Sequence, residues 1–122
     1  SGVSPSLFPY SGSVIVTGSV QGNVPSLSVL SNTASMNCTD ANFYSLQLVN
    51  GSTHVVPTNI KIGQTINVLV STVSGNNITF ASAIKQPSGS AYVPTNATGT
   101  DILTLISFNT SSLYLVGVNN LI

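Results

Sequence analysis

The chain has 122 residues, and only four of them carry a formal charge: Asp40, Lys61, Lys85 and Asp101. A soluble domain of this length normally holds roughly 30 charged residues. With no Glu, no Arg and a net charge of zero, the chain lacks the clusters of ionisable side chains that nucleic-acid binding, metal binding and most catalysis require.

The composition predicts one folded domain, because 42% of the residues are hydrophobic. Residues 1–11 contain Pro5 and Pro9 and are expected to form an extended N-terminal arm, followed by a single β-domain over residues 12–122. The apolar runs are too short for a transmembrane helix, so no membrane partner is expected. Cys38 is the single cysteine and is expected to be a small buried side chain.

Along the chain, apolar residues recur with a period of two, which is typical of β-strands, and no segment shows a helical stripe. Val, Ile, Thr and Tyr dominate these runs and favour a pleated surface. The runs expected to be strands are 13–17, 26–29, 43–49, 53–56, 65–73, 77–82, 101–108 and 112–118.

Turn residues separate these runs. Asn50-Gly51 fits a type I′ hairpin, since both residues tolerate a positive φ, and Ser74-Gly75-Asn76 is expected to act in the same way. The segment 109–111 joins the last two runs, and Gly63-Gln64 predicts a bend into a strand. The sequence therefore predicts an all-β fold, a small antiparallel β-sandwich or barrel of about seven or eight short strands with an extended N-terminal arm.

Residues 84–100 interrupt this rhythm with two prolines and two glycines. A connection this long in a small domain is often functional. Within 84–94, Gln86, Ser88 and Tyr92 supply polar and aromatic groups suited to a sugar, so we predict a receptor-contact loop here, with an ordinary connection as the alternative.

Residues for chemistry are scarce. His54 is the single histidine and lies in an expected strand, and no G-x-S-x-G nucleophile motif is present. Asp40 and Asp101 are expected at turns or strand margins. We therefore expect no catalytic residues, no metal site and no cofactor, and a protein that is not an enzyme.

The C-terminal half resembles a β-rich segment that recurs in bacteriophage tail-fibre and other virion proteins. The resemblance is carried, in order, by 59–68, where Gly63-Gln64 leads into an apolar strand, and by 77–80, 84–89, 101–108 and Leu113-Tyr114. Residues 8–19, which begin with Phe8, Pro9 and Tyr10, are similar to a segment of virion proteins from marine and cyanobacterial phages. Tryptophan is common in the relatives where this chain has Gln86 and Tyr114.

The resemblance implies a non-enzymatic virion structural protein at the particle surface, assembled in the host cytoplasm. Its expected partners are copies of itself, with a homotrimer favoured, and other virion proteins, but no nucleic acid. We expect a capsid decoration or cement subunit, with Phe8, Pro9 and Tyr10 as an assembly arm that adds to a neighbour's sheet edge. The alternatives are a tail-fibre or receptor-binding module that contacts a host-surface glycan, and a subunit of a surface filament assembled by strand exchange.

Overall fold

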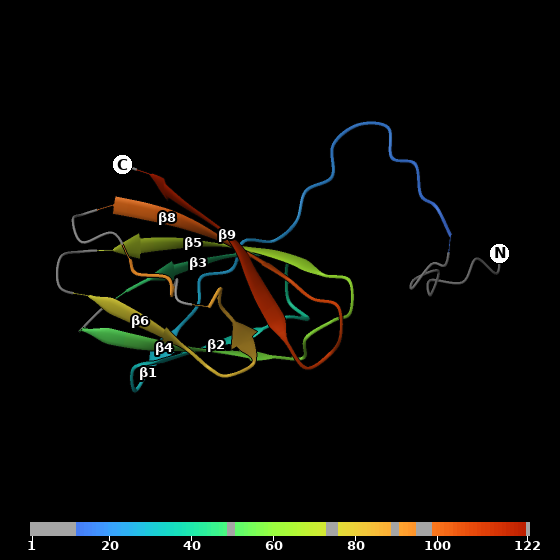
Figure 1. Ribbon diagram of the computed structural model, residues 1–122. Helices are drawn as coiled ribbons and strands as arrows, with labels where there is room; N and C mark the ends of the chain where they lie inside the picture. Colours follow the sequence, from blue (N-terminus) through green and yellow to red (C-terminus); the bar gives the residue numbers. More distant parts are fainter. Residues whose placement is uncertain (1–11, 49–50, 73–75, 89–90, 95–98, 122) are drawn as a thin grey trace.

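The structure, a computed structural model, describes residues 12–48, 51–72, 76–88, 91–94 and 99–121 (Figure 1). These residues contain no helix and form nine strands in two facing sheets. The strands are β1 (Val29–Leu30), β2 (Thr33–Asn37), β3 (Phe43–Gln47), β4 (Ser52–Thr58), β5 (Thr65–Thr72), β6 (Asn77–Phe80), β7 (Ile84–Lys85), β8 (Gly99–Ile106) and β9 (Leu113–Leu121).

One sheet has four strands in the order β1-β2-β4-β6, and the other has five in the order β3-β5-β8-β9-β7. Between β2 and β6 the chain changes sheet at every connection, so strands that neighbour one another in a sheet are not consecutive in sequence (Figure 1). After a crossing to the opposite sheet and back, a strand runs in the same direction as the strand it joins, and the two pair in parallel. Three pairs are of this kind: β2 with β4, β3 with β5, and β4 with β6.

The all-β prediction is confirmed, but the prediction of purely antiparallel sheets is wrong. Antiparallel pairing joins β1 to β2, β5 to β8 and β8 to β9, and the predicted hairpin through 109–111 is the connection between β8 and β9. The predicted bend at Gly63-Gln64 is also confirmed, because Gly63 has a φ of 73° and β5 begins at Thr65.

The predicted hairpin at Asn50-Gly51 is wrong, because β3 and β4 lie in different sheets. The connection between β5 and β6 through 74–76 also crosses from one sheet to the other. The Asn76 side chain links these two crossings, since it accepts a hydrogen bond from the Gly51 N–H at 3.2 Å and donates one to the Leu48 carbonyl at 2.9 Å. Turn chemistry therefore predicted where the chain bends but not which strand it pairs with.

The core lies between the sheets and follows the predicted alternation. Tyr44 and Leu46 of β3 and Ile66, Val68 and Val70 of β5 are buried, while the alternate residues Ser45, Asn67 and Leu69 are more exposed. Strand β2 was missed by the pattern, because its buried residues are Ala34 and Met36, which have little β-propensity. Its partner β1 is joined to it by a tight turn with positive φ at two successive residues.

Residues 12–24, hereafter the free segment, are exposed throughout and form no strand. The strand expected at 13–17 is therefore not formed within one chain, although Val14, Ile15 and Val16 favour it. No described strand edge lies beside this run to supply its backbone hydrogen bonds. Figure 1 shows the start of the free segment standing away from the two sheets. Residues 1–11, the expected arm, lie outside the described residues, so the boundary at residue 11 stays a prediction.

Candidate assembly surface

Of the three named residues of the predicted contact loop at 84–94, Tyr92 is attached to the core and Gln86 bonds to Tyr92. Tyr92 is only 8% exposed, and its ring packs near Phe80 with a centroid distance of 6.3 Å. The Tyr92 N–H donates to the Gln86 Oε1 at 2.8 Å, so Gln86 fixes the path of the loop. Ser88 is the exposed member of the three. Tyr92 thus does not present its ring to a ligand, and use of the remaining loop as a contact surface stays a prediction.

Asp101 was expected at a turn or a strand margin, but it lies within a strand. It is the third residue of β8, it is fully buried, and its Oδ2 accepts a hydrogen bond of 2.6 Å from the Tyr92 hydroxyl. Burial and then this bond to a carboxylate raise the pKa of Tyr92 well above its usual value. The pair therefore anchors the end of the loop to β8. The sequence pattern could not reveal this hydrogen bond, because the alternation of apolar and polar residues does not mark Tyr92 as the partner of Asp101.

The free segment carries several exposed apolar side chains. Ile15 is 93% exposed and Val14, Val16 and Val20 are all more than half exposed. No hydrogen bond of the described residues involves the free segment. The chain joins the body at Pro25–Leu27, where the Ser45 N–H donates to the Pro25 carbonyl at 3.0 Å and the Leu27 N–H donates to the Ser45 carbonyl at 2.8 Å. Phe8, Pro9 and Tyr10, the predicted assembly arm, lie outside the described residues.

A groove on the outer face of the five-stranded sheet lies beside this junction. It measures about 420 Å³ and its lining is mainly apolar, with Val24, Phe43, Leu69 and Ile102 among the residues. Phe43 and Leu69 are substantially exposed. On this face β3, β5 and β8 carry no charged side chain, since Asp101 points inward. The face is therefore suited to an apolar partner surface.

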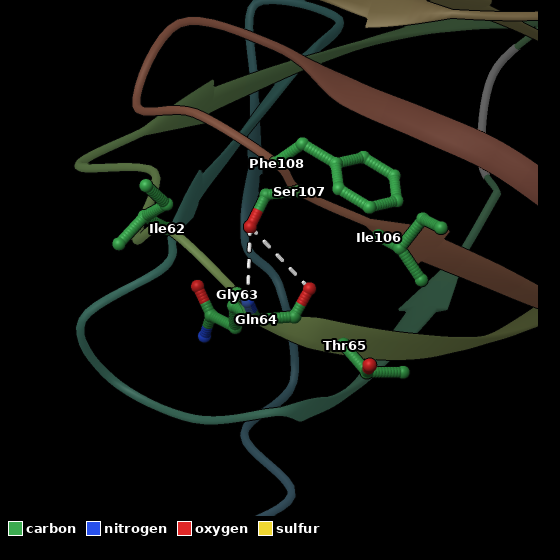
Figure 2. Close-up of a pocket in the computed structure, with 7 residues that line it drawn as sticks. All are labelled: Ile62, Gly63, Gln64, Thr65, Ile106, Ser107 and Phe108. Carbon is green, nitrogen blue, oxygen red and sulfur yellow. Dashed lines mark hydrogen bonds between the residues drawn. The ribbon is translucent and has the colours of Figure 1, made fainter.

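A second hollow, of about 320 Å³, lies at the bend before β5 (Figure 2). Exposed Ile62 and Phe108 line it together with the buried Ser107. The Gln64 N–H donates to the Ser107 Oγ at 2.9 Å, and the Ser107 hydroxyl bonds to the Lys61 carbonyl. Figure 2 shows the Ser107 hydroxyl bonded to the Gln64 backbone, so this hydroxyl is engaged, and the hollow presents the exposed apolar side chains of Ile62 and Phe108.

The ionisable residues are dispersed. The His54 Nδ1 lies 2.8 Å from the Thr79 Oγ1 across β4 and β6, and burial raises the pKa of the Cys38 thiol. Within the described ranges, no three residues of the types His, Cys, Asp and Glu lie close enough to hold a metal ion. The described chain also has no helix with the length and apolar character needed to cross a membrane.

Comparison with protein-family models finds no match to this chain. Comparisons with curated proteins and with solved structures find none either.

Proposed function

We propose that this chain is a non-enzymatic virion structural protein of the capsid decoration or cement type, which binds copies of itself and other virion proteins. The observation that carries the proposal is the free segment, where Ile15 is 93% exposed and its neighbours Val14 and Val16 are also exposed. Exposed apolar runs of this kind mark interaction sites in soluble proteins. Burial against a partner would remove this surface from water and stabilise the assembly.

The uncharged outer face of the five-stranded sheet supports the same proposal. Zero net charge favours association, and the groove lined by Phe43 and Leu69 gives a second apolar contact next to the point where the free segment leaves the body. The resemblance of residues 8–19 and of the C-terminal half to segments of phage virion proteins is our reason for proposing a virion as the assembly.

The test is particle occupancy after removal of the N-terminal residues. We compare the binding of three proteins to virion particles, namely the unmodified chain, a chain lacking residues 1–11 and a chain lacking residues 1–24. Occupancy is measured by electron microscopy. Loss of binding with the longer deletion alone supports attachment through the free segment, whereas loss with the shorter deletion as well assigns attachment to residues 1–11, which contain Phe8, Pro9 and Tyr10. Full occupancy of both truncated chains would exclude this mode of attachment, and no specific binding by the full-length chain would refute the virion role.

A second candidate is a surface filament assembled by strand exchange, which the β-propensity of residues 13–17 favours. Polymers that form from the purified chain alone, without particles, would support it over decoration.

The tail-fibre alternative depends on the loop at 84–94. Host-cell binding that is lost when Pro87 and Ser88 are both replaced by Ala would support that alternative.

A further inference from the structure

Among the described residues, one edge of strand β9 is paired over only part of its length. The strand pairs with β8 along Thr100–Ile106, but on its other side it pairs with β7 only at Leu113 and Tyr114. Beyond the bulge near Val116, residues 117–121 have no strand partner on that side among the described residues, and Val118 and Leu121 are exposed. Natural sheet edges are usually protected by Lys, Pro or short length, and residues 117–121 contain neither Lys nor Pro. This segment is hereafter the β9 edge.

The other sheet edges are less available. Strands β1 and β7 have two residues each and β6 has four, while Pro25–Leu27 already bonds to the middle of β3. The β9 edge has five residues, which is also the length of the apolar run 13–17 in the free segment. Both faces of the β9 edge are exposed, so an added strand could place Ile15 on one face and Val14 and Val16 on the other.

The free segment and the β9 edge lie toward opposite ends of the five-stranded sheet. The segment leaves beside β3, the first strand in the sheet order, and β9 is the fourth strand of that order. In Figure 1 the free segment and the C-terminal end of β9 point to opposite sides of the molecule. An exchange between copies would therefore join unlike surfaces, which is a heterologous contact that closes into a ring or extends as a filament.

We propose that residues 13–17 of one copy add as a strand to the β9 edge of a second copy. This inference rests on the proposed function as an assembly subunit and names the acceptor for its free segment. Backbone hydrogen bonds supply the affinity, and the valine and isoleucine side chains pack laterally against exposed side chains of the β9 edge such as Val118 and Leu121. Neither segment carries a charge, so salt is expected to have little effect on the contact.

Two single substitutions test the pairing from both sides. Ile15→Lys disables the donor without affecting the fold, because Ile15 is almost fully exposed, and Val118→Lys places a charge on the acceptor, where Val118 is 41% exposed. Val93→Lys is the matched control, since Val93 is 67% exposed in the loop at 91–94. Mass is measured by light scattering, and the fold of each variant is checked by circular dichroism.

We expect the unmodified chain and the Val93→Lys control to assemble, and each of the other two variants alone to remain at the monomer mass of 12.5 kDa. An equal mixture of Ile15→Lys and Val118→Lys should double that mass, because one variant keeps the acceptor and the other keeps the donor. A mixture that stays monomeric overturns the inference. Assembly of Val118→Lys alone also overturns it and leaves the proposed function intact.

A disulfide experiment keeps the inference testable if Val118→Lys does not fold. Chains carrying Ile15→Cys are mixed with chains carrying Val118→Cys and oxidised, and a mixture with Val93→Cys is the control. Cys38 is 2% exposed and does not compete. We expect at least a several-fold excess of the covalent dimer over the control, and equal yields would overturn the pairing. An unmodified chain that is monomeric in solution but binds particles would refute the strand addition between copies and leave the proposed function intact. A chain that neither self-associates nor binds particles would refute the proposed function as well.

Discussion

The loop at 84–94 and the free segment were both expected to meet partners, yet they differ in how they relate to the core. The loop carries polar and aromatic side chains, but Tyr92 turns inward and bonds to Asp101 of β8, while Gln86 bonds to the Tyr92 N–H within the loop. The free segment carries mainly apolar and small polar side chains and makes no hydrogen bond with the described body. The direction in which a residue faces is therefore decided by the packing partners available to it and not by its chemical type.

The largest expected difference between the two regions comes from Tyr92→Ala. Loss of a buried ring and its hydrogen bond should lower the free energy of unfolding by about 3–5 kcal/mol. Urea unfolding measures this change. The variant, where folded, should keep its ability to assemble, and a stability close to that of the unmodified chain would show that the loop is not part of the core.

Tyr92→Phe isolates the hydroxyl. Removal of the bond to the buried Asp101 carboxylate should cost about 2 kcal/mol near neutral pH. The raised pKa of Tyr92 also predicts a pH dependence. Above about pH 10 tyrosines in the unfolded chain lose their protons. The folded chain keeps the Tyr92 proton, so stability should fall as pH rises through this range.

Unfolding measured from pH 8 to pH 11 checks this dependence, and the Phe variant should lose stability less steeply above about pH 10. An identical slope in the two proteins would contradict the assignment of the raised pKa to Tyr92.

Gln86→Ala should have a smaller effect. The half-buried side chain accepts one hydrogen bond from the Tyr92 N–H, so its loss should lower the free energy of unfolding by about 1 kcal/mol. Ser88→Ala is the control in the same loop, because Ser88 is exposed and should leave stability unchanged. Equal effects of the two substitutions in urea unfolding would contradict the positioning role of Gln86.

The smallest effect on folding is expected in the free segment. Ile15→Ala should change the free energy of unfolding of the monomer by no more than about 0.5 kcal/mol, because the side chain is exposed in the single chain. The same variant should weaken assembly in light scattering. A loss of monomer stability comparable to that of Gln86→Ala would show that residues 13–17 pack against their own body.

Particular residues show how far the sequence determines the fold. Alternation in 43–49 and 65–73 predicted β3, β5 and their buried faces, since that signal depends only on each strand having one side in the core. Pairing was not predictable in the same way. Asn50-Gly51 is suited to a hairpin, but the chain crosses there to the other sheet, and β4 pairs with a strand earlier in the chain.

The candidate surface was predicted only in part. The apolar run at 13–17 is evident in the sequence, but its exposure depends on the lack of a partner edge, which only the assembled sheets reveal. The burial of Asp101 was missed because it depends on a tyrosine nine residues earlier, at the end of an irregular loop. The free side of β9 was missed for the same kind of reason, since an edge is defined by the sheet order and not by the strand itself.

The winding of β2 to β6 has a consequence for the rate of folding. Strand β4 pairs with β2, and β6 with β4, across an intervening strand that lies in the opposite sheet, so these pairs form between segments that are not adjacent in sequence. Pairing between such distant segments is slow, and all-β domains of this kind typically fold in milliseconds to seconds. During that interval strands with almost no charge are exposed to other chains, so the refolding yield is expected to fall as protein concentration rises.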